Sequence, residues 1–211
     1  MIPWILVDEI LDKNTSITLT NLNPEDGNIT PLELVVISLL ISTLKPKKIL
    51  EIGTFNGRTT INMALNQPKD GEVITIDLPT NETKLPLAPS EEKYILGKDG
   101  GRQTHAQIKQ IYGDSADYDF TDYIDKIDFM FVDGSHSYEY TMSDSKLAYN
   151  LVRRGGYILW HDYGSPYWPG VTEALNELYL GNRDFKSLQH IVGTSLCILQ
   201  NDKYSYIDGV P

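Results

Sequence analysis

Hydrophobic and polar residues alternate along the chain in blocks that predict strands and helices in turn. Short apolar runs bounded by turn residues predict five strands, at residues 48–52, 72–76, 108–112, 127–132 and 157–160. Apolar positions at helical spacing predict helices at about 58–66, 138–151 and 170–180, and Gly155-Gly156 is expected to close the second of them. A further helix is expected to start at Thr30-Pro31 and to run to Leu44, where Pro46 ends it.

The order of these blocks predicts the fold class. Residues 185–200 form two apolar runs around Gly193-Thr194, which predicts a hairpin after the last helix. Strand–helix units followed by a hairpin imply an α/β fold with a doubly wound, mostly parallel sheet and an antiparallel edge. The 211 residues fit a single domain, predicted at 31–211 behind an N-terminal extension at 1–30. The stretch 78–106 is rich in Pro and Gly and too long for an ordinary connection, which predicts a lid or, alternatively, a disordered insertion.

Charge and composition exclude some partners. The net charge of −11 disfavours nucleic acid and anionic membranes, which both require a basic surface. No apolar run is long enough to span a bilayer, and the short apolar start of the chain lacks the basic residues of a signal peptide. The single cysteine, Cys197, cannot form an intrachain disulfide and lies in an apolar run, so it is expected in the core of a cytoplasmic protein.

The first strand ends in a glycine turn that predicts a ligand site. Gly53 and Gly57 stand between the strand and the next helix, and such turns bind nucleotide-like ligands in open α/β sheets. A dinucleotide fingerprint starting at Gly53 would need glycine at 55 and 58, where the chain has Phe55 and Arg58. The carboxylate of Glu51 would also repel a pyrophosphate, so the turn favours a ligand with an ammonium or sulfonium group.

Asp77 ends the second predicted strand, about 20 residues after the turn, where a carboxylate can accept the hydroxyls of a ribose. The alternative is that Asp77 only caps a turn. Together, Glu51-x-Gly53-x-x-x-Gly57, Asp77 and Gly113-Asp114-Ser115 resemble the cofactor motifs of class I S-adenosylmethionine-dependent methyltransferases. Residues 131–139 and 155–163 are similar to the small-molecule O-methyltransferase branch called methyltransferase family 24, and the resemblance covers roughly residues 30 to 200. It implies a Rossmann-like sheet of seven strands in the order 3-2-1-4-5-7-6, with strand seven antiparallel.

The resemblance also implies roles for single residues. Cofactor contacts are implied for Glu51, Gly53, Thr54, Phe55, Gly57, Asp77, Asp114, Ser115 and Asp133. The first turn would surround the methionine part of S-adenosylmethionine, Asp77 would hold the ribose, and Asp114 would accept from the adenine amino group. Asp133 would face the transferable methyl. For Asp114-Ser115 the alternative is a cap on the following helix.

A second group of polar residues follows the fourth and fifth strands. Asp133 and Asp162 end neighbouring strands in this topology, so their side chains are expected to open on one crevice, together with His136 and His161. Two carboxylates and an imidazole, from Asp133, Asp162 and His161, could hold a divalent metal such as Mg, Mn, Zn or Fe. Related metal-dependent enzymes have an acid where this chain has His161, so a different metal, a weaker site and no metal all stay open. His136 is the candidate general base, with Asp133 as its catalytic neighbour.

We therefore expect methyl transfer from S-adenosylmethionine to a small-molecule acceptor, on a hydroxyl, with a divalent metal as an open question. Tyr163, Tyr167 and Trp168 follow strand five and could stack on an acceptor or simply pack the loop. The alternatives are metal-independent transfer to oxygen or nitrogen, a non-catalytic or nicotinamide-dependent nucleotide-binding domain, and an enzyme that modifies proteins. A homo-oligomer is compatible with the resemblance, because relatives often assemble.

Overall fold

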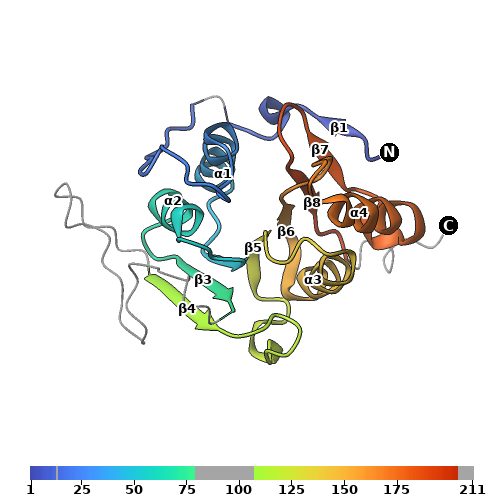
Figure 1. Ribbon diagram of the computed structural model, residues 1–211. Coiled ribbons are helices and arrows are strands. Elements are labelled where there is room, and N and C mark those ends of the chain that lie inside the picture. Colours follow the sequence, from blue (N-terminus) through green and yellow to red (C-terminus); the bar gives the residue numbers. More distant parts are fainter. Residues whose placement is uncertain (13, 79–106, 204–211) are drawn as a thin grey trace, which may run out of the picture.

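The computed structural model of the protein describes residues 1–12, 14–78 and 107–203 (Figure 1). Within them, eight strands form one sheet in the order β1-β7-β8-β6-β5-β2-β3-β4. The strands are β1 (Trp4–Ile5), β2 (Lys48–Ile52), β3 (Glu72–Asp77), β4 (Gln107–Tyr112), β5 (Ile127–Val132), β6 (Val152–Trp160), β7 (Gln189–Ile191) and β8 (Cys197–Gln200).

The strand order confirms the predicted doubly wound topology. The seven predicted strands are β2 to β8, and they lie in the order 3-2-1-4-5-7-6, with β8 antiparallel to both β6 and β7. The sheet has eight strands rather than seven, because β1 pairs in parallel with β7 at the edge. A strand of two residues is too short for a period of two to predict it.

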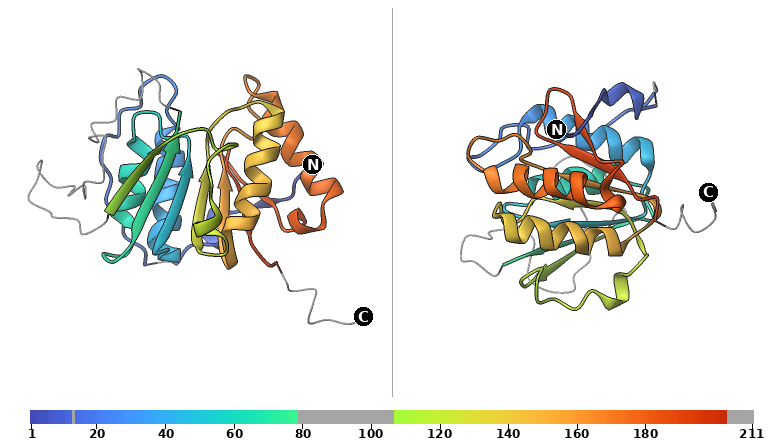
Figure 2. Two further views of the ribbon diagram at one scale, coloured as in Figure 1. Left: turned by 90° about the horizontal axis from the view of Figure 1, so that it is seen from below. Right: turned by 90° about the vertical axis from the view of Figure 1, so that its right-hand side faces the viewer.

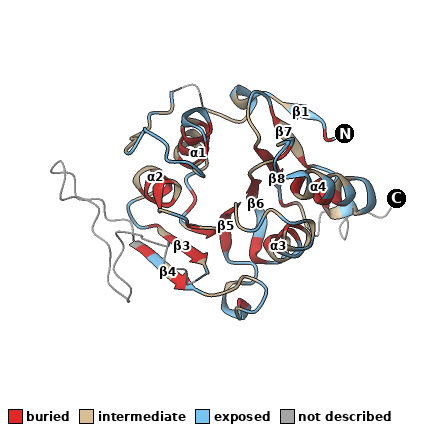
Figure 3. Cartoon of the chain, in the orientation of Figure 1, coloured by how far each residue is buried: buried red, intermediate tan, exposed pale blue. Residues whose placement is uncertain are grey.

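Two pairs of helices cover the two faces of the sheet (Figures 1 and 2). The helices are α1 (Pro31–Leu44), α2 (Arg58–Asn66), α3 (Tyr138–Leu151) and α4 (Pro169–Gly181), and short 3-10 turns lie at Val7–Glu9, Thr121–Tyr123 and Arg183–Phe185. Strand β5 contributes to both cores by alternation: Phe129 and Phe131 pack with α1 and α2, and Met130 and Val132 pack with α3 and α4. In Figure 3 much of the central strands is coloured as buried.

Helix α1 begins where its sequence predicts. The Thr30 hydroxyl accepts from the Glu33 backbone N–H, and the Glu33 carboxylate accepts in return from the Thr30 backbone N–H at 2.9 Å. Pro31 occupies the first helical position, and Lys45 ends the helix in a left-handed conformation with φ of 51°. This capping box also fixes the direction of Glu33, whose carboxylate reaches the functional site described below.

Strand β6 is longer than predicted. The helix before it ends at Leu151, and Gly155 and Gly156 lie inside the strand instead of closing the helix. The pairing with β5 shifts register between Ile127 and Phe129, so β6 has extra residues that do not pair with β5. A Cβ on Gly156 would lie 2.8 Å from the Asp128 carbonyl oxygen, which explains the glycine at that close approach.

The N-terminal segment packs against the rest of the chain. Ile2 is buried in the core between the sheet and α4, and the predicted hairpin carries β1 at its outer side. Cys197 is fully buried, as predicted, and burial raises the pKa of its thiol well above the usual range. The predicted lid at 78–106 lies outside the described residues, apart from Leu78. None of the described helices combines the length and the apolar character needed to cross a membrane.

Candidate functional site

The glycine turn after β2 lies directly against the end of β5. Gly53 has φ of +90°, and a Cβ at this position would lie 1.9 Å from the Asp133 carbonyl oxygen. Only glycine fits both the backbone conformation and the close approach. The turn therefore brings the end of β2 into contact with the residue that carries the predicted catalytic carboxylate.

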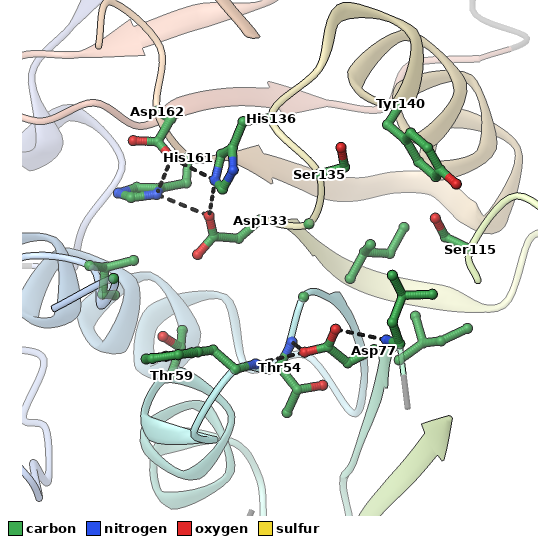
Figure 4. A pocket seen from close by; sticks show the side chains of 18 of the residues that line it. Thr54, Thr59, Asp77, Ser115, Asp133, Ser135, His136, Tyr140, His161 and Asp162 are labelled. Carbon is green, nitrogen blue, oxygen red and sulfur yellow. Dashed lines mark hydrogen bonds and ion pairs between the residues drawn. The ribbon is translucent and has the colours of Figure 1, made fainter. Parts of the chain in front are cut away.

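Asp77, at the end of β3, holds this turn in place. Its Oδ2 accepts from the backbone N–H groups of Thr54 at 2.9 Å and Phe55 at 2.8 Å, and its Oδ1 accepts from Leu78 N–H at 2.7 Å. A carboxylate offers about four lone-pair positions, so one is left for another donor. Asp77 thus orders the loop while it lines the cavity (Figure 4).

A cavity of about 570 Å³ opens along the carboxyl ends of the strands. Most of the predicted site residues line it, namely Gly53, Thr54, Phe55, Asp77, Asp114, Ser115, Asp133, His136, His161 and Asp162. Further lining residues that the sequence did not indicate include Gly27, Asn28, Ile29, Asn56, Thr59, Gly134, Ser135 and Tyr140. The volume lies within the range of pockets that hold nucleotide-sized ligands.

Glu51 and Gly57 are not among the lining residues. Gly57 is the N-cap of α2, with φ of 77°. Glu51 is fully buried, and its Oε2 accepts from the hydroxyls of Thr60 and Thr75, the latter at 2.7 Å. Burial raises the pKa of Glu51 to about 8, although both hydroxyls lower it. Direct contact between Glu51 and a cofactor stays a prediction, and in this structure its carboxyl group braces β2 against α2 and β3.

The turn after β4 is shaped by helix α3. Asp114 accepts from Tyr140 O–H at 2.6 Å and from Ala116 N–H at 2.9 Å, and both bonds lower the pKa of Asp114. Ser115 donates to the carboxylate of Asp144 at 2.8 Å. Burial raises the pKa of Asp144 to about 6. Tyr140 and Asp144 were not predicted, because their helix periodicity gives no sign that they meet the turn after β4.

Asp133, His136, His161 and Asp162 do converge at the rim, as their strand positions predict (Figure 4). His136 Nε2 lies 3.0 Å from Asp162 Oδ2 and 3.9 Å from Asp133 Oδ1. His161 Nδ1 lies 3.0 Å from Asp133 Oδ1 and 3.2 Å from Asp162 Oδ2. Both imidazoles therefore contact both carboxylates.

A third carboxylate, Glu33 of α1, completes this cluster. Its Oε2 lies 3.4 Å from His161 Nε2, and its Oε1 accepts from the backbone N–H and hydroxyl of Ser195. Burial alone would lower the pKa of His161, but the charge of Asp133 and hydrogen bonds to three carboxylates raise it to about 12. Burial opposes ionisation of Asp162, yet its bonds to His136 and His161 lower its pKa to about 2. His161 is therefore an imidazolium held among acids.

A possible metal-ligand set lies at the rim, and it has His136 where the predicted set has His161. Among the described residues, Asp133, His136 and Asp162 offer one ligand atom each within 4.8 Å of one another. His161 lies beside this set, with Nδ1 against the carboxylates of Asp133 and Asp162 and Nε2 against Glu33, so a role for it as a ligand stays a prediction. The donor set of two oxygens and one imidazole nitrogen fits a divalent transition metal.

Trp168 covers one face of His136. The two rings stack with centroids 4.2 Å apart and an interplanar angle of 20°. Trp168 lines the cavity while 44% of it stays exposed, whereas Tyr167 is 81% exposed and Tyr163 is buried. Of the three aromatic residues predicted near the acceptor, Trp168 therefore lies at the site.

The fold and the polar residues at its strand ends together define a class of protein. An open α/β sheet with a glycine turn after its first central strand, and with carboxylates at successive strand ends, is the architecture of Rossmann-like proteins that bind nucleotide cofactors. The chain belongs to methyltransferase family 24: the family model, described as a methyltransferase domain, matches residues 50–163, more than half of the chain.

The chain is also similar to individual curated proteins. The chain is 31% identical over 138 residues to an uncharacterized protein, R132, of Acanthamoeba polyphaga mimivirus, covering 61% of this chain and 58% of that protein. It is 31% identical over 150 residues to a caffeoyl-CoA O-methyltransferase of Stellaria longipes, covering 70% of this chain and 57% of that protein. The chain thus spans somewhat over half the length of these relatives.

Solved structures share the fold. The chain is similar to the S-adenosylhomocysteine-bound methyltransferase PaMTH1 of Podospora anserina, with a TM-score of 0.62 at 18% identity over 84% of this chain and 81% of that chain. It is also similar to the O-methyltransferase TomG of Streptomyces achromogenes, solved with S-adenosylmethionine, with a TM-score of 0.55 at 19% identity over 84% and 82%. These likenesses confirm the Rossmann-like methyltransferase fold.

Proposed function

We propose that the protein transfers a methyl group from S-adenosylmethionine to a hydroxyl group of a small-molecule acceptor. The observation that carries the proposal is the continuity of one cavity from the turn after β2 to the His136–Asp162 pair at its rim. Family membership supports it, as do relatives named caffeoyl-CoA O-methyltransferase and catechol O-methyltransferase B. A cytoplasmic location and self-assembly stay predictions.

In this proposal the cofactor follows the strand ends. Gly53, Thr54 and Phe55 contact its methionine part, and the free acceptor position of Asp77 takes a ribose hydroxyl. The turn with Asp114 and Ser115 holds the adenine. Asp133 lies beside both the turn and His136, so it places the sulfonium methyl near the base.

His136 acts as the general base. When its Nε2–H donates to Asp162, the neutral ring has Nδ1 as its basic nitrogen. As the acceptor oxygen bonds to the methyl carbon, the carbon–sulfur bond breaks, its electron pair stays on sulfur, and the hydroxyl proton passes to His136. Asp162 then stabilises the imidazolium, and the stacked Trp168 keeps the ring in place.

A metal-assisted version is the second candidate, because Asp133, His136 and Asp162 form a ligand set. A divalent ion held by these residues would lower the pKa of the acceptor hydroxyl. His161 Nδ1 already contacts the carboxylates of Asp133 and Asp162, which are the oxygen donors that such an ion would use. We therefore favour the version in which His136 is the base.

Calorimetry with S-adenosylhomocysteine and with NADH tests the cofactor. Tight binding of NADH without binding of S-adenosylhomocysteine would overturn the proposal. A panel of hydroxyl acceptors, assayed with EDTA and with added Mn²⁺, tests the metal: activity that survives EDTA excludes the metal-assisted version.

The variant His136→Gln tests the base. We expect kcat to fall about 10²- to 10⁴-fold while S-adenosylhomocysteine still binds. His190→Gln is the matched control, because His190 lies on β7 and contacts the Thr194 carbonyl outside the cavity. Equal activity of the two variants would remove His136 from the mechanism.

A further inference from the structure

Helix α2 uses one of its faces to bind an extended segment of its own chain. Arg58, Asn62 and Asn66 are spaced by four residues and therefore lie on one side of the helix. Asn62 accepts from Thr20 N–H at 2.9 Å and donates to Thr20 C=O at 3.1 Å. Asn66 accepts from Thr18 N–H and donates to Thr18 C=O, both at 2.8 Å.

The spacing of these contacts matches the geometry of the two segments. Four residues of helix rise about 6 Å, and two residues of extended chain rise about 6.6 Å. The side-chain amides of α2 thus meet every second residue of the segment, as a neighbouring strand would. We call residues 18–29 the strap.

Arg58 fixes the end of the strap nearest the cavity. Its Nε donates to Asn21 C=O at 2.6 Å, its Nη2 to Leu22 C=O at 3.2 Å and its Nη1 to Ile29 C=O at 2.8 Å. The planar guanidinium therefore joins both ends of the 21–29 loop. Arg58 is 3% exposed, and among the described residues no carboxylate forms an ion pair with it.

Burying the Arg58 charge costs free energy that merely attaching a surface segment to α2 would not require. A buried charge without a counter-charge is tolerated only where hydrogen bonds satisfy it, and here backbone carbonyls of the strap do so. Residues 21–27 are themselves exposed, so the strap gains little from burying apolar surface. We therefore expect the hydrogen bonds from Arg58 to the strap to serve the contacts that the 21–29 loop makes.

The loop held by Arg58 forms part of the cavity wall. Gly27, Asn28 and Ile29 line the cavity beside the turn after β2. Asn28 and Asn56 exchange side-chain hydrogen bonds of 3.0 and 3.3 Å, and Gly27 adopts φ of +92° with the Phe55 ring within van der Waals reach of its Cβ position. The wall is thereby joined to the turn that binds the cofactor in our proposal.

We propose that Arg58 is a positioning residue, which holds the strap as a fixed wall of the cofactor pocket through the Asn28–Asn56 contact. The inference rests on the proposed function, because it requires that this cavity binds S-adenosylmethionine. Arg58 does not line the cavity and acts only through the strap.

The test compares Arg58→Ala with Asn66→Ala. Both variants remove hydrogen bonds to the backbone of the strap. Asn66, however, bonds to Thr18 at the other end of the strap, and neither of these two residues lines the cavity. If the strap of Arg58→Ala occupies its wall position in about a tenth of the molecules, the Kd for S-adenosylhomocysteine rises about tenfold. Asn66→Ala is expected to change that Kd by less than about twofold, whatever its effect on the melting temperature.

Arg58→Lys and Asn28→Ala provide further readouts if Arg58→Ala does not fold. Lysine keeps the charge but cannot join three carbonyls in one plane, so an intermediate Kd is expected. Asn28→Ala removes the contact of the wall with the turn and should also raise the Kd.

Proteolysis reports on the strap directly. Glu25 is exposed in the loop, so endoproteinase Glu-C should cut there faster in Arg58→Ala, and S-adenosylhomocysteine should slow the cut in the wild type. A wild type that does not bind S-adenosylhomocysteine overturns the proposed function and this inference with it. A wild type that binds, together with Arg58 and Asn28 variants of unchanged Kd, overturns the inference alone.

Discussion

Replacing Glu51 by Gln should stabilise the protein, and increasingly so as the pH rises. Glu51 is fully buried at the end of β2, where its Oε2 accepts from the hydroxyls of Thr60 and Thr75. Its Oε1 has no hydrogen-bond partner among the described residues. Glutamine keeps the accepting oxygen and the shape of the side chain but cannot ionise.

The magnitude follows from the pKa of Glu51. Burial raises it to about 8 from the ordinary 4.5, a difference of about 3.5 that corresponds to on the order of 5 kcal/mol of unfolding free energy. Because the folded pKa lies above the unfolded one, the favourable contribution of the neutral carboxyl is complete below about pH 4.5. It is lost progressively as the pH rises from about 4.5 to about 8.

Urea denaturation of the wild type and Glu51→Gln over this pH range measures the effect. The difference in unfolding free energy should widen with pH by up to about 1.4 kcal/mol for each unit and level off above about pH 8. All other titrating groups are shared by the two proteins, so the difference isolates Glu51. Glu173→Gln, at an exposed position of α4, is the matched control for removing one acid.

A difference that stays constant between about pH 5 and about pH 9 would refute this reasoning. It would show that the folded protein accommodates an ionised Glu51, and so that some group supplies the charge compensation that burial otherwise denies. Glu51 would then be available as a partner for a cationic ligand, as the resemblance implies.

Two further substitutions test the contacts at the site. Gly53→Ala should lower the unfolding free energy by at least about 2 kcal/mol more than Gly164→Ala, since both glycines have positive φ but only Gly53 approaches Asp133; equal losses in urea titrations would show that the turn can shift. His161→Ala should cost about 3–5 kcal/mol, because Glu33, Asp133 and Asp162 lose their shared cation, and Glu33→Gln should return part of that loss in the double variant. A loss below about 1 kcal/mol in His161→Ala would contradict the buried ion cluster.

The strands, the doubly wound class and the positions of most site residues could be predicted from local patterns and one rule of topology, whereas the strand order came from the family resemblance. Carboxyl ends of parallel strands meet at one edge of a sheet, so Asp77 and Asp133 had to lie near Gly53. The strand β1 and the bulge in β6 could not be predicted. Both arise from pairing with residues distant in the chain, and neither leaves a periodic pattern.

The contacts that fix side-chain roles are also non-local. Glu33 and His161 are 128 residues apart, and only the packing of α1 over the sheet brings them together. The contact between the strap and α2 does have a counterpart in the sequence. Arg58, Asn62 and Asn66 place polar groups on one face of a helix, and Arg58 and Asn62 are buried, which indicates a face covered by polar backbone rather than by solvent.

The charges of the cavity lining disfavour a pyrophosphate ligand. The sequence disfavours a dinucleotide because Phe55 and Arg58 stand where its fingerprint needs glycine, and because Glu51 would repel a pyrophosphate. The structure alters the second reason, since a carboxyl with a pKa of about 8 is largely neutral near pH 7 and Glu51 does not line the cavity. The repulsion comes instead from carboxylates that line the cavity itself, with Asp77 facing the turn and Asp133 and Asp162 at the rim. No lysine or arginine is among the lining residues that the structure describes, and His161 is already engaged by three acids. Such a lining disfavours the negative charges of a dinucleotide pyrophosphate, whereas the cationic sulfonium of the proposed ligand, S-adenosylmethionine, is compatible with it.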